Sequence, residues 1–221
     1  MINTSQVSQS QEKLDVERSR GDLGNAKEVS FRVHTMITRR LRGSTPSARA
    51  ARAYLRSAIG KEVGSIPEIW TYTLENSNDE SSMRQLEATH GERAVHTALT
   101  LWALHQGSHA SDMHRQWDRP RTIGSAVRSL ALQGTHDIQE DHPAYKRLCA
   151  MIAAPTFEAL AIHARGLISL MKSAAIPMDY ARFAADLYQW QKPHYRPAVL
   201  RQWGRDFSRT TPHNDELEPT H

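Results

Sequence analysis

The stretch that most clearly indicates the fold class of this chain is residues 155–171, which read PTFEALAIHARGLISLM. Apolar residues recur along it at steps of three or four positions: Phe157, Leu160, Ala161, Ala164, Leu167, Ile168 and Met171. Because an α-helix has 3.6 residues per turn, this spacing gathers them on one side of a helix. The stretch therefore predicts an amphipathic helix, opened by Pro155, that packs its apolar side into a protein core.

The same periodicity recurs along most of the chain, and no segment shows a convincing strand pattern. The first helix is predicted over residues 26–42, because Asn25 is a good N-cap and Gly43 a good terminator. A second helix begins at Pro46 and ends near Gly60. The other predicted helices follow Pro67, cover residues 92–106 and 122–133, begin at Pro143 and Pro155, and cover residues 179–190 and 197–207. We therefore predict an all-α protein of about nine helices without a sheet.

The polar stretch from residue 107 to 120 lacks periodicity and marks the best candidate boundary inside the chain. We predict two packed helical bundles, an N-terminal one over residues 24–106 and a C-terminal one over residues 107–209. The ends are rich in Ser and Gln or in Thr, Pro and acids. Residues 1–23 and 210–221 are therefore expected to be disordered tails.

Composition argues against several classes of protein. The longest apolar runs are too short to span a bilayer, and the N-terminus lacks the apolar core of a signal peptide, so no membrane association is expected. A single cysteine excludes an internal disulfide, and together these features favour the cytoplasm. Cys149 falls beside Leu148 and Ile152 in the helix that begins at Pro143, and all three are predicted to point inward.

The charged residues are unevenly distributed along the chain. The net charge is +4, yet residues 31–60 contain arginines and no acidic residue. Arg49, Arg52 and Arg56 lie three and four positions apart, so they share one side of the second helix. The planar guanidinium group suits phosphate better than an ammonium group does. This helix is a candidate phosphate-binding surface, and alanine at all three positions is expected to leave the fold intact.

Further basic residues occur on several other predicted helices. For each of them alone, a solvated surface is the more common explanation. Taken together, several basic ridges are typical of a protein that binds nucleic-acid backbone. The candidate nucleic-acid-binding residues are Arg39, Arg42, Arg49, Arg52, Arg56, Arg119, Arg121, Arg128, Arg147, Arg165, Lys172, Arg201 and Arg205.

No set of residues forms a complete catalytic site. His105 and His109 are four positions apart with Asp112 beyond, but Gly107 intervenes and no zinc-binding spacing is present. Asp179 is better explained as a helix N-cap than as a catalytic acid. The tryptophans at positions 102, 190 and 203 fall on inward sides, whereas Trp117 lies in the polar stretch. We therefore expect no enzymatic activity, no metal and no cofactor.

Six stretches in their order along the chain resemble the CasB family, the small subunit of the type I-E CRISPR Cascade complex. They are ARAARAYLRSA (48–58), SIPEIW (65–70), ALTLWALHQ (98–106), RPRTIGSAVRSLA (119–131), YKRLCAMIAAPTFEALAIHARGLISLMKSAAIPMDYARFAADLYQW (145–190) and VLRQWGRDF (199–207). The resemblance extends from about residue 31 to residue 208. In one respect this chain departs from the family, which often has a basic residue directly after the glycine of its Leu/Ile-Gly motif. Here that position is Ser125, between Arg121 and Arg128.

The resemblance implies an all-α, non-catalytic subunit of an RNA-guided surveillance complex. Its implied partners are guide RNA, target DNA, the backbone and large subunits of Cascade, and a second copy of itself. In such complexes base pairing reads the sequence and protein holds the backbone, so the subunit is expected to stabilise the R-loop. The alternatives are a helix-turn-helix DNA-binding regulator and, less favoured, a helical metal-dependent hydrolase using His105, His109 and Asp112.

Overall fold

The computed structural model describes residues 23–75, 87–116, 121–133, 138 and 141–209. Within these ranges the chain forms nine α-helices, and the prediction of an all-α fold is confirmed. A single isolated bridge between His114 and Met178 is the β-type pairing found in the described part, and no strand forms there. None of the helices described is both long and apolar enough to cross a lipid bilayer.

The helices begin and end close to the predicted positions. In chain order the elements are α2 (Ala26–Thr35), the π-helical η1 (Met36–Leu41), α3 (Pro46–Ser57), the 3-10 turn η2 (Pro67–Ile69), α4 (Trp70–Thr73), α5 (His90–Gln106), α6 (Ile123–Ala131), α7 (Pro143–Ile152), α8 (Phe157–Ser173), α9 (Tyr180–Trp190) and α10 (Arg196–Ser208). The N-caps Asn25, Thr45 and Asp179 each accept a hydrogen bond from a backbone N–H in the first turn, as their residue types predict.

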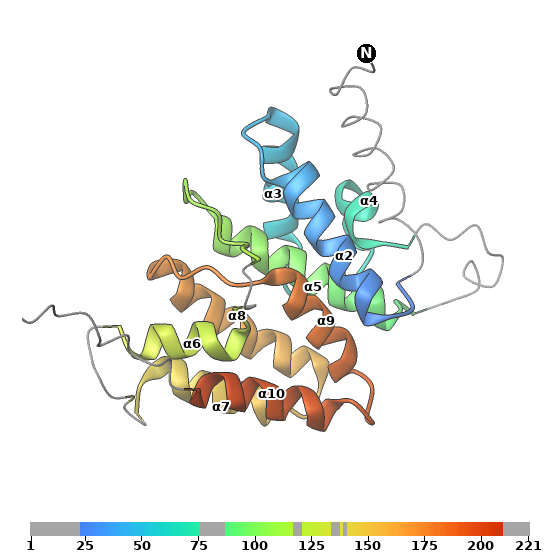
Figure 1. Cartoon of the computed structure of the whole chain (residues 1–221). Helices are drawn as coiled ribbons and strands as arrows, with labels where there is room; N and C mark the ends of the chain where they lie inside the picture. The colour runs from blue at the N-terminus through green and yellow to red at the C-terminus, as the bar shows by residue number, and fades with distance from the viewer. Residues whose placement is uncertain (1–22, 76–86, 117–120, 134–137, 139–140, 210–221) are drawn as a thin grey trace, which may run out of the picture.

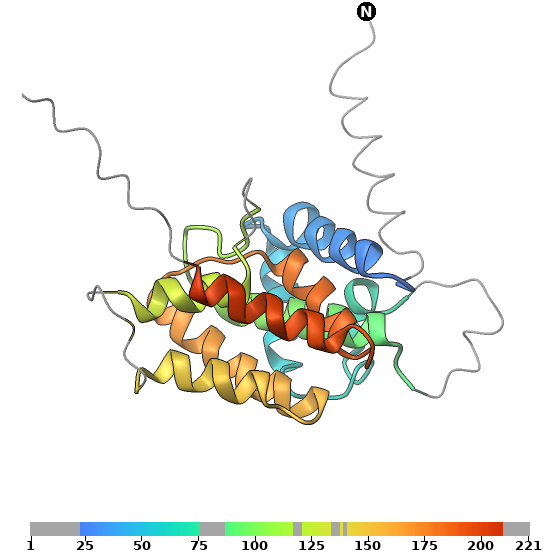
Figure 2. The same ribbon diagram turned by 60° about the horizontal axis from the view of Figure 1, so that its bottom comes forward.

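Helix α9 lies in the middle of the molecule, although it comes near the end of the chain (Figure 1). It packs against α2 and α5, which belong to the N-terminal half, and against α10. Helices α6, α7, α8 and α10 form the other side, with α7 along α8 and α10 along α6. The turned view in Figure 2 shows α10 crossing the front, with α2 beyond it on one side and α7 on the other.

Core packing joins the two halves of the chain. The large side chains Trp102, Trp190 and Trp203 are almost completely buried, as predicted from their positions on inward sides. One hydrophobic cluster includes residues from α2 through α10. The boundary proposed at residue 107 stays a prediction, but the two segments share this cluster. The predicted tails lie outside the described residues except for Leu23, which is buried.

Two local features differ from the sequence-based expectation. The predicted single helix over residues 26–42 changes at Met36 into a π-helical turn, in which Arg42 N–H donates to the Ile37 carbonyl oxygen at 2.9 Å. Cys149, predicted to point inward, is exposed. The reason is angular: Ala144, Leu148 and Met151 form the buried stripe of α7, and the residue after Leu148 lies about 100° around the helix.

Candidate nucleic-acid interface

The segment between α5 and α6 is fastened to the start of α9 by backbone hydrogen bonds. Met178 N–H donates to the Met113 carbonyl at 3.1 Å, and Arg115 N–H donates to the Met178 carbonyl at 3.2 Å. Asp179 N–H donates to the Arg121 carbonyl at 2.9 Å. This stretch was predicted only as a polar boundary without periodicity. The structure shows that it brings arginines from distant parts of the sequence to the N-terminal end of α9.

Several of these arginines lie close enough to affect one another electrostatically. Burial lowers the pKa of Arg121, and the positive charge of Arg115 lowers it further. Arg42, at the end of η1, forms an ion pair with Asp112 at 2.6 Å. The charges of Arg42 and Arg39 also reach His34. Burial lowers the pKa of His34, the charge of Asp179 opposes this shift, and the charges of Arg42 and Arg39 add to it. Arg182 follows on the first turn of α9 and is 44% exposed.

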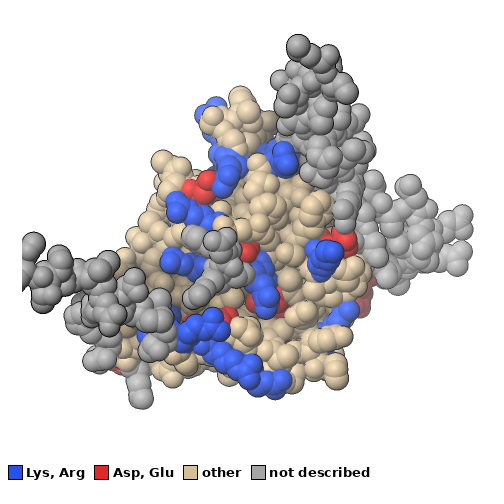
Figure 3. Space-filling model, viewed as in Figure 1, with Lys and Arg blue, Asp and Glu red and all other residues tan. Residues whose placement is uncertain are grey.

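Figure 3 shows Lys and Arg side chains in a broken band across one face of the molecule. The band runs from the end near η1 and α3, past the start of α9, to α6 and α10. Helix α10 contributes Arg201 and Arg205, both exposed. Acidic side chains are fewer on this face, so it presents a positive potential to solvent.

Buried His114 and partly buried His34 form a hydrogen-bonded pair in this region. Tyr180 N–H donates to His114 Nδ1 at 3.1 Å, so the proton of neutral His114 is on Nε2. His114 Nε2 lies 3.0 Å from His34 Nδ1 and therefore donates to it. Burial, followed by the charges of His34 and Arg42, lowers the pKa of His114 to about 3. His114 is thus neutral at pH 7, and its 3.9 Å approach to Asp179 is not an ion pair.

The buried imidazoles of His105 and His114 predict an acid-sensitive fold. Burial and the charge of His109 lower the pKa of His105 to about 4, and burial lowers that of His114 to about 3. Between these values and the pKa of about 6.5 in the unfolded chain, the unfolded state binds more protons, so stability rises with pH. Asp186, whose pKa burial raises to about 6, acts in the opposite direction but is one group against two. We expect the guanidinium concentration at the unfolding midpoint to decrease as the pH is lowered from about 7 to about 4.5.

A matched pair of variants identifies the source of this pH dependence. His105→Gln keeps a neutral polar partner for the Tyr180 hydroxyl, which lies 2.9 Å from His105 Nδ1, and removes one titrating group. Its midpoint should change less with pH than that of the unmodified protein. His194→Gln alters an exposed imidazole and should leave the pH dependence unchanged. A midpoint that is constant with pH in the unmodified protein contradicts the prediction.

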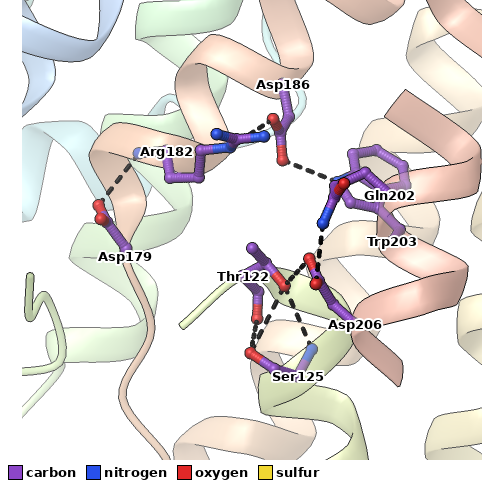
Figure 4. A network of polar contacts seen from close by, with 8 residues as sticks. All are labelled: Thr122, Ser125, Asp179, Arg182, Asp186, Gln202, Trp203 and Asp206. Atoms are coloured by element: carbon purple, nitrogen blue, oxygen red, sulfur yellow. Dashed lines mark hydrogen bonds and ion pairs between the residues drawn. The ribbon is translucent and has the colours of Figure 1, made fainter. Parts of the chain in front are cut away.

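A polar network joins α9, α10 and the start of α6 (Figure 4). Asp186, 2% exposed, accepts from Arg182 Nε at 2.9 Å and from Trp203 Nε1 at 2.8 Å. Burial raises the pKa of this carboxyl to about 6, although both donors oppose the shift. The network therefore holds Nε of Arg182, while the side chain as a whole remains 44% exposed.

Asp206, the second carboxylate of the network, holds the residue that precedes α6. Asp206 accepts from the Thr122 hydroxyl at 2.9 Å and from Gln202 Nε2 at 2.9 Å. Thr122 is also the N-cap of α6, accepting from Ser125 N–H at 3.3 Å. Ser125, the position where the family often has a basic residue, donates its hydroxyl back to the Thr122 carbonyl at 3.1 Å. In this chain Ser125 therefore takes part in the hydrogen bonds that form the start of α6.

The arginines of α3 have different environments from one another. After burial, the charges of Arg56 and Arg49 lower the pKa of Arg52, so the three lie near one another as their spacing predicted. Arg49 and Arg56 are exposed, but Arg52 is half-buried. Its Nη1 donates to the carbonyl oxygens of Leu41 and Gly43, the latter at 2.8 Å. The expectation that all three could be replaced without effect on the fold is therefore corrected for Arg52.

Replacing Arg52 with alanine should destabilise the protein by about 2 kcal/mol, because two carbonyl groups at the end of η1 lose a charged donor. Arg49→Ala and Arg56→Ala are the matched controls, and each should change the free energy of unfolding by less than about 0.5 kcal/mol. Urea denaturation of the three variants measures the difference. Equal stability of all three would show that the Arg52 hydrogen bonds contribute nothing.

The other predicted binding residues are distributed over several elements. Arg128 donates to the Phe207 carbonyl at 3.1 Å, at the end of α10. The side chain of Arg147 lies over Gly166, and that of Lys172 lies over Gly107. Arg165 is exposed on α8. Arg119 lies outside the described residues, as does Trp117.

Two arginines of this candidate interface were not predicted from the sequence. Arg115 stands alone in a polar stretch, and Arg182 is followed four residues later by Asp186, which made it resemble an ordinary surface ion pair. Neither carries a local signal of binding. Their significance comes from the contacts that fasten the loop to α9.

The three residues of the metal hypothesis point to different partners. His105 lies beside the Tyr180 hydroxyl, His109 Nε2 is 2.9 Å from the Lys172 carbonyl, and Asp112 pairs with Arg42. Among the residues with described positions, no group of three or more His, Cys, Asp or Glu side chains is arranged to hold a metal ion. The hydrolase alternative therefore loses the cluster on which it depended.

Comparison with known proteins gives one consistent result. The family model described as CRISPR-associated protein Cse2 matches residues 51–207. The crystal structure of CasB from Thermobifida fusca is 33% identical, with a TM-score of 0.62, and the match covers 82% of this chain and 96% of that one. No curated protein matches the sequence.

Two more distant structures support the fold alone. A Cse2-family CRISPR-associated protein from Thermus thermophilus is 21% identical with a TM-score of 0.55, and the match covers 82% of this chain and 96% of that one. CasB from M. ruber is 18% identical with a TM-score of 0.55, and the match covers 81% and 91% of the two chains. All of these relatives are matched over nearly their whole length.

Proposed function

Because the chain belongs to the Cse2 family of CRISPR-associated proteins, which includes CasB, we propose that it is the non-catalytic small subunit of a type I-E Cascade complex. In this role it binds the phosphate backbone of nucleic acid and stabilises the R-loop during target recognition. Its partners are the guide RNA, the target DNA, the backbone and large subunits, and a second copy of itself, in the cytoplasm. No catalytic step is assigned to it.

The observation that supports this proposal most directly is the gathering of arginines around the start of α9. These arginines come from three segments: η1 and its C-cap (Arg39, Arg42), the segment between α5 and α6 (Arg115, Arg121) and α9 (Arg182). The hydrogen bonds around Met178 and Asp179 hold that segment to α9, and the Arg42–Asp112 ion pair joins it to the end of η1. Of these arginines, Arg42 pairs with Asp112 and Arg182 with Asp186, and further anions would relieve the repulsion between neighbouring guanidinium groups. A nucleic-acid strand supplies such anions at regular spacing, and its contact with protein needs no recognition of base sequence.

The proposal divides the remaining predicted residues into binding residues, secondary candidates and residues that mainly stabilise the fold. Arg201 and Arg205 extend the surface along α10 as exposed side chains. Arg49 and Arg56 on α3, and Arg147, Arg165 and Lys172 on α7 and α8, are secondary candidates. Arg52 and Arg128 donate to backbone carbonyls, so we assign them mainly to the fold.

A salt titration of the purified protein tests the proposal. Single-stranded RNA and DNA should bind without strong sequence preference, and the logarithm of the affinity should fall linearly with the logarithm of salt concentration. For three or more phosphate contacts to a single strand the slope should be about −2 or steeper. A flat salt dependence argues against backbone binding. A strong preference for one duplex sequence favours the helix-turn-helix regulator instead.

A further inference from the structure

A groove of about 500 Å³ lies between α2 and α9, on the two helices that pack side by side near the arginine band. This volume is within the range of about 300–1,000 Å³ typical of small-molecule sites. The α2 wall includes Lys27, Phe31 and His34. The α9 wall includes Arg182 and Gln189.

The polar groups of this groove are mainly hydrogen-bond donors. Because His34 Nδ1 accepts from His114, neutral His34 carries its proton on Nε2, and that N–H has no partner among the described residues. Arg182 uses Nε for Asp186, and its side chain is 44% exposed. Gln116 adds an amide from the loop that is fastened to α9, and Lys27 adds an ammonium group.

The charge of the groove is positive. Among the residues described, Asp186 supplies the one carboxylate that lines the groove. This carboxylate already accepts hydrogen bonds from Arg182 and Trp203. Arg182 lines the groove and is one of the exposed arginines at the start of α9. A suitable occupant is therefore anionic, rich in acceptor atoms and flat enough for a slot beside the ring of Phe31.

We propose that this groove receives one unpaired nucleotide of a single strand bound along the arginine face. Its base lies beside Phe31, its acceptor atoms meet His34 Nε2 and the amides of Gln116 and Gln189, and its phosphate lies between Lys27 and Arg182. The inference rests on the proposed function, which requires contact with the backbone alone. It adds a contact with a base, made without discrimination among sequences, since every base has a flat face.

The test compares two single strands of equal length and charge, an oligothymidylate and the same backbone with abasic sites, in fluorescence anisotropy with the full chain. The unmodified protein should bind oligothymidylate about tenfold more tightly, the change expected for one stacked base. Phe31→Ala should reduce this preference to near one. Gln116→Ala with Gln189→Ala, two changes outside the hydrophobic core, should reduce it without altering the fold.

The matched control is the double variant Arg201→Ala with Arg205→Ala. It should weaken binding of both strands by the same factor and keep the preference for bases. Equal affinity of the unmodified protein for the two strands overturns the inference and leaves salt-sensitive backbone binding, and therefore the proposed function, in place. Absence of binding to either strand overturns both.

Photocrosslinking locates the base independently of folding in the variants. A strand containing 4-thiothymidine, irradiated with the unmodified protein, should label peptides from α2 or α9, identified by mass spectrometry. Crosslinks confined to α3, α7 or α8 place the bases elsewhere and overturn the inference. Retention of the base preference in both groove variants overturns it as well.

Discussion

Replacing Gly124 with alanine is expected to lower the free energy of unfolding by about 3 kcal/mol, at the upper end of the range for an overpacked site. A Cβ at this position would lie 2.2 Å from the carbonyl oxygen of Trp203 and 3.2 Å from the backbone nitrogen of Phe207. Both atoms belong to the backbone of α10, which cannot turn aside as a flexible side chain does. Helices α6 and α10 must therefore separate, which strains the hydrogen bond from Thr122 at the start of α6 to Asp206 on α10.

The matched control for this prediction is Gly204→Ala on α10. No atom lies within 4 Å of a Cβ placed there, so the substitution should be tolerated or should stabilise the helix by up to about 1 kcal/mol. Thermal and urea denaturation of the two variants measure the contrast. If Gly124→Ala unfolds at the same urea concentration as the unmodified protein, the close approach of α6 to α10 is not a constraint on the fold.

Replacing Arg115, Arg201 and Arg205 together with alanine should weaken single-strand binding by about a hundredfold at about 0.1 M salt. Each phosphate contact with a single strand contributes about 0.7 to the log–log salt slope, so three contacts account for about two units of slope. All three side chains are exposed, and no hydrogen bond from them to another described residue is known to stabilise the fold. Anisotropy titrations across salt concentrations measure both the affinity and the slope.

The control with the same loss of charge is Arg49→Ala, Arg56→Ala and Arg165→Ala, which changes exposed residues on α3 and α8. It should reduce affinity by less than the first variant. The reverse order would move the principal binding surface to α3, as the spacing of its arginines first suggested. Unchanged denaturation curves for both variants ensure that the comparison concerns binding.

Local patterns in the sequence were sufficient to predict the helices, although not the π-helical turn at Met36–Leu41. The helix caps at Asn25, Thr45 and Asp179 and the burial of Trp102, Trp190 and Trp203 follow from residue type and a 3.6-residue period. These properties depend on neighbours within about one helical turn, which the sequence displays directly. Cys149 was assigned wrongly because periodicity is coarse at the edge of an apolar stripe.

The functional surface, by contrast, depended on contacts between distant segments. Arg115 and Arg182 are 67 positions apart, and their segments come together because Met178 and Asp179 form hydrogen bonds with the loop between α5 and α6. Arg52 was a candidate by its spacing and Arg128 as one of a basic set, and their guanidinium groups donate to carbonyl oxygens at helix ends. A sequence determines that an arginine is charged and which side of its helix it occupies. Only the tertiary structure decided which arginine side chains stay exposed and which bond to the protein itself, because a long side chain reaches partners that chain order does not place beside it.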